Sequence, residues 1–383
     1  MLRLRLSSLV FSLCWGFAVV ASGSLQNVSA QIKPTQEPFS VNPGFIIAEG
    51  NLNELLIQGQ KLVEEQKYKQ ALAVYQQAAS LAPDNAKIFS GIGYLEATLE
   101  NYAAAVKAYS RAIAIEPDNA EFHVALGFSL ANFGDNPSAI AAYEKAIELA
   151  PEKLENYLGL GVVLLRDEQY ERVVDTYFRI NSIAPNNIQA QSLAASALSQ
   201  QGKYQEAIEL LNKAIASSPS DSQLQLKLAS LYLRQQDLPL ALKTLRKAQR
   251  LDPENELIPF QIAKLVQSQG DNTEALKLYR KAVELNPDLA IAQVEIANLL
   301  LEQENYIQAI VVYRRLLELE PNNPMTHQNL GTALQGRGRK KDAVASWQKA
   351  IELYESQNDT AKIQEINQLI DSIDAENIDE EDE

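Results

Sequence analysis

The sequence predicts an all-α protein in which nine similar pairs of helices stack side by side as a solenoid. The first observation is a ladder of prolines that stand 34 residues apart without a slip: Pro83, Pro117, Pro151, Pro185, Pro219, Pro253, Pro287 and Pro321. The second is that small and large residues recur at fixed positions inside each 34-residue unit, at helical spacing. A unit copied at constant length is typical of a solenoid, in which each unit packs only on its neighbours.

Residues 1–30 have the features of a secretory signal. Two arginines precede an apolar stretch (6–21), and small residues at 28–30 offer a cleavage site. The alternative is an uncleaved membrane anchor, although the apolar stretch is shorter than the roughly 20 residues that a span needs. Cys14 is the only cysteine, so cleavage leaves a chain without thiols. We expect a periplasmic protein that is soluble after cleavage.

Residues 31–51 have the composition of a linker. They carry three prolines among mixed polar residues, which favours an extended segment. The alternative is that this segment lies along the first repeat through Phe45, Ile46 and Ile47.

Residues 52–357 divide into nine consecutive repeats. Each repeat has a small residue at its eighth position, alanine or valine at its twentieth and an aromatic residue or leucine at its twenty-fourth, and most have alanine at the twenty-seventh. The first of these positions lies on one face of a first helix, and the other three lie on one face of a second. Small residues are expected where two helices cross closely, and the large residue fills the space beside them.

Two further prolines fit the same arrangement. Pro137 and Pro239 both occupy the eighteenth position of their repeats. That position is in the first turn of the second helix, where a missing N–H costs little. Each repeat is therefore expected to hold two antiparallel helices, with a turn at the recurring proline.

This pattern resembles the tetratricopeptide repeat family over most of the chain, because all nine units match its small–large–small signature in register. The resemblance implies a right-handed superhelix of nine helical hairpins whose first helices line a concave groove. It also implies that positions 2, 5, 9, 12 and 13 of each repeat point into that groove.

The groove positions are apolar or aromatic in repeats two to four and polar with scattered positive charge later. The earlier ones are Tyr94, Val124, Phe128, Leu158, Val162, Leu165 and Arg166, and the later ones Ser196, Arg234, Lys264, Gln267 and Asn298. An apolar strip in a concave surface favours an extended or helical peptide. The alternative is that these residues pack on the neighbouring repeat. Asparagine stands at the ninth position only in Asn298, so the carboxylate clamp of some family co-chaperones is not expected.

The C-terminal residues are predicted to cap the solenoid. Residues 358–373 place Ile363, Ile366, Ile370 and Ile373 on one side of a helix, as an end cap requires. The tail 374–383 contains seven acidic residues and is expected to be disordered. Its carboxylates, among them Asp379, Glu380, Glu381 and Asp382, are a candidate site for Mn²⁺, since such cations take oxygen ligands.

No catalytic arrangement is found in the sequence, and we do not expect an enzyme. There is no nucleophile motif, no phosphate-binding glycine loop and no metal spacing of His or Cys. The two histidines, His123 and His327, share the fourth position of their repeats. They are interpreted as packing residues, with a metal or proton-handling role as the alternative.

The charge and the architecture bear on the partner. A net charge of −15 argues against nucleic acid, which needs a basic stripe. An exported acidic chain of nine repeats also resembles the processing-associated tetratricopeptide proteins of cyanobacteria. That resemblance implies photosystem II biogenesis: binding the precursor of a reaction-centre core subunit, aiding its maturation and loading it with manganese. The alternative is a general periplasmic scaffold without a metal role.

Overall fold

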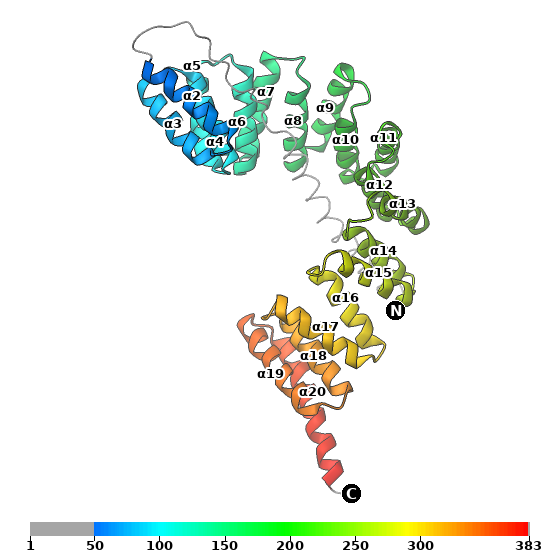
Figure 1. Ribbon diagram of the computed structural model, residues 1–383. Coiled ribbons are helices and arrows are strands. Elements are labelled where there is room, and N and C mark those ends of the chain that lie inside the picture. Colours follow the sequence, from blue (N-terminus) through cyan, green and yellow to red (C-terminus); the bar gives the residue numbers. More distant parts are fainter. Residues whose placement is uncertain (1–49, 382–383) are drawn as a thin grey trace. The chain divides into compact units, whose positions relative to one another are not determined.

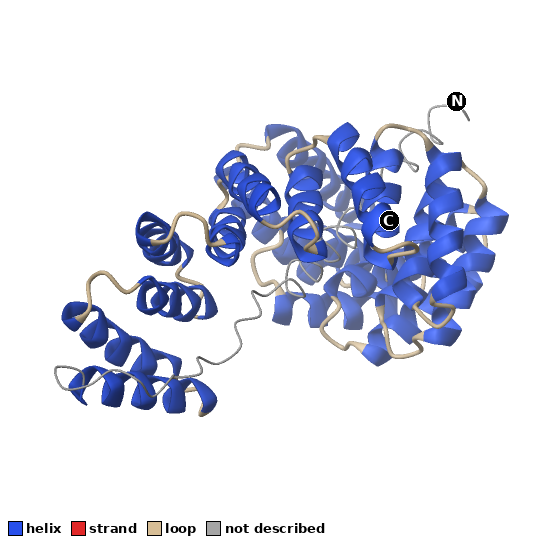
Figure 2. Ribbon diagram, turned by 90° about the horizontal axis from the view of Figure 1, so that it is seen from above, coloured by secondary structure: helices blue, strands red, loops and turns tan. Residues whose placement is uncertain are grey.

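The structure, a computed structural model, describes the backbone of residues 50–381 and the side chains of residues 51–373. The predicted signal and nearly all of the predicted linker lie outside these residues. Every regular element in the described part is an α-helix, and no strand occurs there (Figures 1 and 2). The helices form nine pairs followed by a last single helix, which confirms the predicted all-α repeat fold.

The first helices of the pairs start soon after the turns at the repeating prolines. They are α2 (Gly50–Glu64), α4 (Ala86–Thr98), α6 (Ala120–Phe133), α8 (Leu154–Arg166), α10 (Ile188–Gln200), α12 (Ser222–Arg234), α14 (Leu257–Ser268), α16 (Ala290–Glu302) and α18 (Pro324–Gly336). The second helices are α3 (Tyr68–Leu81), α5 (Tyr102–Ile115), α7 (Asn136–Leu149), α9 (Tyr170–Ile183), α11 (Tyr204–Ser217), α13 (Leu238–Leu251), α15 (Asn272–Leu285), α17 (Tyr306–Leu319) and α19 (Lys340–Ser356).

The described residues fall into two compact units. The N-terminal unit holds α2 to α12 (residues 50–235), and the C-terminal unit holds α13 to α20 (residues 236–381). Inside each unit, the second helix of one pair packs on the first helix of the next, as α5 does on α6 and α17 does on α18. Each unit is therefore a stack in which neighbours bury one another's apolar faces.

In repeats one, two, three and nine, a glycine of the first helix faces a large aromatic residue of the second. The residues at the twentieth and twenty-seventh positions are buried in all nine repeats, as Ala105 and Ala112 are in the second. Gly93 lies directly against Tyr109, since a Cβ built on the glycine would be 2.8 Å from Tyr109 Cε2. The aromatic ring thus occupies the space that the absent side chain leaves, which confirms the predicted helix faces.

The fourth repeat departs from this arrangement. Its large residue, Tyr177, is only half-buried and lies against exposed Phe178, with 5.3 Å between ring centroids. Gly161 instead faces Leu193 and Thr176. The expectation that Tyr177 fills the space beside the small residues is therefore corrected. The physical reason is that Val173 replaces the usual alanine at the twentieth position of this repeat and takes up room at the crossing.

The turn inside each hairpin contains one residue with left-handed backbone. In all nine repeats this is the fifteenth position, and five of the nine residues are not glycine. In the second repeat, Glu100 has a φ of 63° and the N–H of Asn101 donates to the carbonyl of Glu96. This six-to-one hydrogen bond ends the first helix and reverses the chain.

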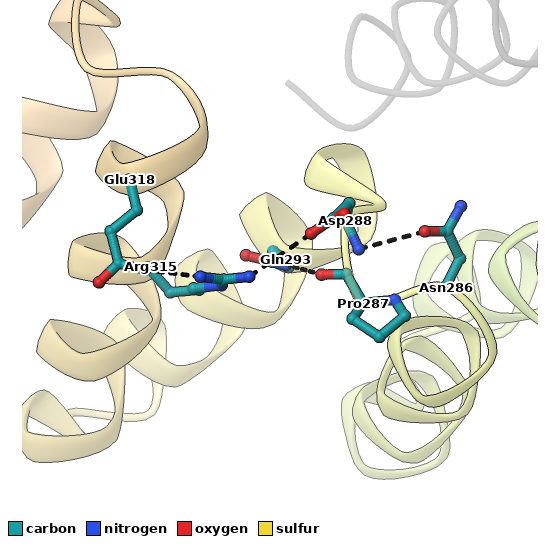
Figure 3. Close-up of polar contacts among 6 residues, drawn as sticks. All are labelled: Asn286, Pro287, Asp288, Gln293, Arg315 and Glu318. Atoms are coloured by element: carbon teal, nitrogen blue, oxygen red, sulfur yellow. Dashed lines mark hydrogen bonds and ion pairs between the residues drawn. The ribbon is translucent and has the colours of Figure 1, made fainter.

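The turn between repeats is fixed by polar side chains from the following pair. At Pro287 (Figure 3), Gln293 Nε2 donates to the proline carbonyl at 2.5 Å. Arg315 of α17 reaches back to Asp288 at 3.4 Å and also pairs with Glu318 at 2.6 Å. The same position of the second repeat, Arg111, donates to the carbonyl of Pro83 at 3.1 Å. These contacts tie the second and the eighth repeats to the turns that precede them.

The last helix, α20 (Thr360–Glu381), packs on α19 and closes the C-terminal unit. Ile366 and Ile373 are buried, and Ile363 and Ile370 are half-buried, so the predicted capping face is confirmed. Gln328 Nε2 of α18 also donates to Glu365 at 3.0 Å. The helix continues to Glu381, which corrects the expectation that disorder begins at residue 374.

Candidate protein-binding surface

The first helices form the inner layer of the N-terminal unit. Neighbouring first helices touch, α4 with α6, α6 with α8 and α8 with α10, whereas neighbouring second helices in residues 50–235 make no comparable contact (Figure 1). In a curved stack, the helices on the inside of the bend are the ones that approach each other. We call the layer of α4, α6, α8, α10 and α12 the inner layer.

The N-terminal end of the inner layer carries partly exposed apolar side chains. Tyr94, Val124 and Phe128 are each half-buried. The Phe128 ring meets Tyr102 edge-on, with 6.5 Å between centroids. Val124 lines a surface cavity of about 850 Å³ formed by the Pro117 turn and the starts of α6 and α8. These three predicted residues keep surface available to a partner.

Three other predicted groove residues are part of the core. Leu158, Val162 and Leu165 are 6%, 4% and 8% exposed and belong to one cluster of buried residues. A Cβ on Gly159 would lie 2.3 Å from Tyr143 Cε1, so α8 packs directly on the preceding hairpin. The expectation that these aliphatic residues line an open groove is therefore corrected, because close packing of α8 brings them into the core.

Beyond the apolar end, the inner layer becomes cationic. Arg166 Nη1 donates to the carbonyl of Ala131 at 2.5 Å, and Arg234 Nη1 lies 3.5 Å from Gln200 Oε1. Lys227 donates to the hydroxyl of Ser192. Burial among neighbouring helices lowers the pKa of Lys227 to about 8, against a smaller opposing effect of Asp221.

Sequence reasoning missed Lys227, because it stands at the sixth position of its repeat. The sequence could have indicated this residue, because Lys227 stands between Leu226 and Leu228 in α12. Ser196, which was predicted, donates to the carbonyl of Ser192 at 2.9 Å. It lies on α10, between the cationic residues of α8 and α12.

The C-terminal unit places the later predicted residues in polar contacts. Asn298 Oδ1 accepts from Tyr313 OH at 2.8 Å and from Asn329 Nδ2 at 3.2 Å. Two donors on one oxygen fix the orientation of the Asn298 amide, so its Nδ2 faces away from them. Tyr313 and Asn329 were not predicted. The packing of neighbouring helices brings both residues within hydrogen-bond distance of Asn298.

Lys264 and Gln267, both on α14, also lie beside aromatic residues. The Lys264 ammonium is 5.8 Å from the ring centroid of Phe260. Gln267 Oε1 accepts from Tyr279 OH at 2.6 Å. Burial raises the pKa of Glu295, and the charge of Lys264 opposes that rise.

The two histidines have a structural role. His123 Nε2 lies 2.8 Å from the carbonyl of Pro117, and His327 Nε2 lies 3.0 Å from the carbonyl of Pro321. Gln293, at the same repeat position, bonds Pro287 in the same way. The side chain at the fourth position therefore donates a hydrogen bond to the proline carbonyl of the turn that precedes it. The histidines were interpreted as packing residues, and their role is this hydrogen bond.

No group of three or more His, Cys, Asp or Glu side chains fit to hold a metal occurs among the described residues. The candidate manganese ligands Asp379, Glu380, Glu381 and Asp382 lie outside the residues whose side chains are described. The manganese site at the C-terminal tail therefore stays a prediction.

Comparison with known proteins identifies the repeats. Sequence profiles described as tetratricopeptide repeat match residues 193–256, 267–324 and 328–356, and a profile described as TPR repeat matches 59–99 and 93–132. A profile for anaphase-promoting complex, cyclosome, subunit 3 matches residues 132–214. Comparison with curated proteins gives no significant match.

Among the similar solved structures, one with a TM-score above 0.5 shows the same fold. A tetratricopeptide repeat protein from Parabacteroides merdae is 17% identical with a TM-score of 0.54, covering 65% of this chain and 98% of its own. MamA from Desulfovibrio magneticus is 23% identical over 44% of this chain and 96% of its own, with a TM-score of 0.42. PilF from Pseudomonas aeruginosa is 19% identical over 53% and 93%, with a TM-score of 0.44. The repeats, their helix pairs and these profile matches agree, and the chain belongs to the tetratricopeptide repeat family.

Proposed function

We propose that this chain is an exported scaffold that binds another polypeptide along the inner layer of its N-terminal unit. Tetratricopeptide repeat proteins in general bind protein partners, and their fold is a scaffold for such interactions. The observation that carries the proposal is that Tyr94, Val124 and Phe128 stay partly exposed on adjacent helices of that layer. Half-buried aromatic side chains on a rigid layer are typical anchors for a bound peptide.

The proposed periplasmic location rests on the sequence of residues 1–30, which lie outside the described structure. No helix in the described part is long and apolar enough to cross a membrane. We propose that any contact with a membrane comes through the partner. We also propose that the chain has no enzymatic role, because its repeated residues serve turns and helix crossings rather than a reacting centre.

A finer proposal is that the chain is an assembly factor of photosystem II. In this role it would bind the precursor of a reaction-centre core subunit and aid its maturation and manganese loading. Support comes from the predicted export signal, the acidic charge and the uninterrupted array of nine repeats, which together resemble the processing-associated proteins of cyanobacteria. The competing proposal is a general periplasmic scaffold with no metal role.

The two proposals separate in a titration with manganese. If the C-terminal carboxylates collect Mn²⁺, calorimetry of the full chain will give heat that is lost in the variant Asp379→Asn, Glu380→Gln, Glu381→Gln, Asp382→Asn. Equal titrations of the two proteins would exclude this tail as the metal site.

The protein-binding proposal is tested by removing the two inner-layer aromatics. Tyr94→Ala with Phe128→Ala is expected to weaken retention of the partner in a pull-down while the helical circular dichroism stays unchanged. The matched control is Tyr177→Ala with Phe178→Ala, which removes the same two ring types from α9, a second helix outside the inner layer. Unchanged retention in the first variant, or an equal loss in both, would contradict binding by the inner layer.

A further inference from the structure

Some basic residues on the second helices of the N-terminal unit pair with carboxylates, whereas three on the inner layer are held by neutral oxygens. On the second helices, Lys145 pairs with Glu148 at 2.9 Å and Arg172 pairs with Glu144. On the inner layer, Arg166, Lys227 and Arg234 have no carboxylate within ion-pair distance among the described residues, and each is held instead by a neutral oxygen. The chain has a net charge of −15, so the lack of a carboxylate beside these three cations does not come from a shortage of acidic residues.

The three cations are positioned by the helices that carry them. Lys227 and Arg234 are seven residues apart on α12, so they lie on one stripe of that helix, about 10 Å apart along its axis. Arg166 ends α8. Between these helices, α10 presents Ser192 and Gln200, the acceptors for Lys227 and Arg234. The result is a set of fixed donors on α8 and α12, with the acceptors of Lys227 and Arg234 on α10 between them.

The three cations would bind a carboxylate more strongly than the neutral oxygens that they contact now. A hydrogen bond from arginine or lysine to a carboxylate is stronger than one to a hydroxyl or an amide oxygen. Lys227 is half-buried, and water solvates it poorly at that position. An anion that replaced the neutral acceptors would relieve this cost, whereas the exposed lysines of the outer helices are already well solvated.

We propose that the inner face of α8, α10 and α12 binds an acidic stretch of the partner polypeptide, whose side-chain carboxylates pair with Arg166, Lys227 and Arg234. This inference rests on the proposed protein-binding function and adds the chemistry of the partner. Since the apolar residues lie on α4 and α6, the partner carries an apolar segment next to its acidic one. Nucleic acid is disfavoured, because three cations on an acidic protein are too few to attract a phosphate backbone.

The test measures binding of labelled peptides to the full chain by fluorescence anisotropy. The probes are ten glutamates, ten glutamines and a ten-nucleotide single-stranded thymidine. The site variant is Arg166→Gln, Lys227→Gln, Arg234→Gln. The control variant is Lys69→Gln, Lys107→Gln, Lys213→Gln, which removes the same charge from exposed positions on second helices.

The glutamate peptide is expected to bind the unchanged chain more tightly than the glutamine peptide. The site variant is expected to lose about tenfold or more in affinity for it, while the control loses about twofold at most, since tenfold corresponds to roughly one charged hydrogen bond. The inference is overturned if glutamate binds no better than glutamine, if both variants lose affinity equally, or if the thymidine strand binds as tightly. The aromatic pull-down does not depend on these cations, so the proposed function stands or falls separately.

Discussion

At the scale of single residues, the turns inside the hairpins hold stored strain. Left-handed backbone disfavours residues with a Cβ by about 1–2 kcal/mol, yet Glu100, Glu168 and Glu304 adopt it. Glycine occupies the equivalent place in Gly134 and Gly202. The hydrogen bonds of the turn therefore hold five non-glycine residues in a conformation that glycine adopts without this cost.

This position gives a paired prediction about stability. Glu304→Gly is expected to raise the free energy of unfolding by roughly 0.5–1 kcal/mol, because the strain at a φ of 56° disappears. Gly202→Ala is expected to lower it by roughly 1 kcal/mol, because alanine would take up the strain at a φ of 75°. Urea unfolding of both variants checks the two signs, and a destabilised Glu304→Gly would contradict this account of the turn.

Lys227 gives a prediction about pH. Its folded pKa of about 8 lies below the ordinary 10.5, so between these values the unfolded chain binds more protons than the folded one. Because of this residue, the free energy of unfolding increases as the pH rises from 8 to 10.5. Below pH 8 the buried lysine is charged, and the folded protein carries the full cost of burying that charge.

Lys227→Met is accordingly expected to be more stable than the unchanged chain at pH 7, by roughly 1–3 kcal/mol. The difference should narrow at pH 10. Urea unfolding at the two pH values measures it, with Lys213→Met, an exposed site, as the control. A constant difference across this range would mean that Lys227 is well solvated in the folded protein.

At the scale of the helices, stability depends on close crossings inside each hairpin. Ala105 is fully buried on α5, whereas Ala103, two residues earlier on the same helix, is exposed. Ala105→Leu is expected to lower the free energy of unfolding by roughly 1–3 kcal/mol, since the added atoms have no room. Ala103→Leu is expected to change it by less than about 0.5 kcal/mol. Equal thermal melts of the two variants would show that the helix faces are assigned wrongly.

These faces were predictable because each depends on contacts within one repeat. The small residue at Gly93 and the large one at Tyr109 are 16 positions apart in the same hairpin, and the pattern returns nine times. Exposure on the inner layer was not predictable in the same way. Leu158 and Val162 are buried because α8 approaches the preceding hairpin at Gly159, a contact outside the repeat signature.

The candidate site shows the same division. Tyr94 and Phe128 were found from their repeat positions, and both keep exposed surface. The contacts of Asn298 with Tyr313 and Asn329 needed the relative placement of three helices. The role of the histidines was also hidden, because the bond from His123 to the Pro117 carbonyl depends on the shape of a turn.

At the scale of the whole molecule, the chain repeats one hairpin and varies the surface. The hairpin residues at the crossings stay nearly constant, while the inner layer changes from aromatic on α4 and α6 to cationic on α8 and α12. A constant scaffold with a graded face suits recognition of one extended polypeptide, whose successive segments meet different chemistry. The partner's sequence is therefore expected to be apolar at one end of the bound stretch and acidic at the other.

The most direct test of binding by the inner layer is hydrogen–deuterium exchange of the full chain with and without its captured partner. Slower exchange is expected in α4, α6, α8, α10 and α12 when the partner is bound, while α5, α7, α9 and α11 exchange as before. Protection confined to the second helices, or absent from the inner layer, would contradict the account.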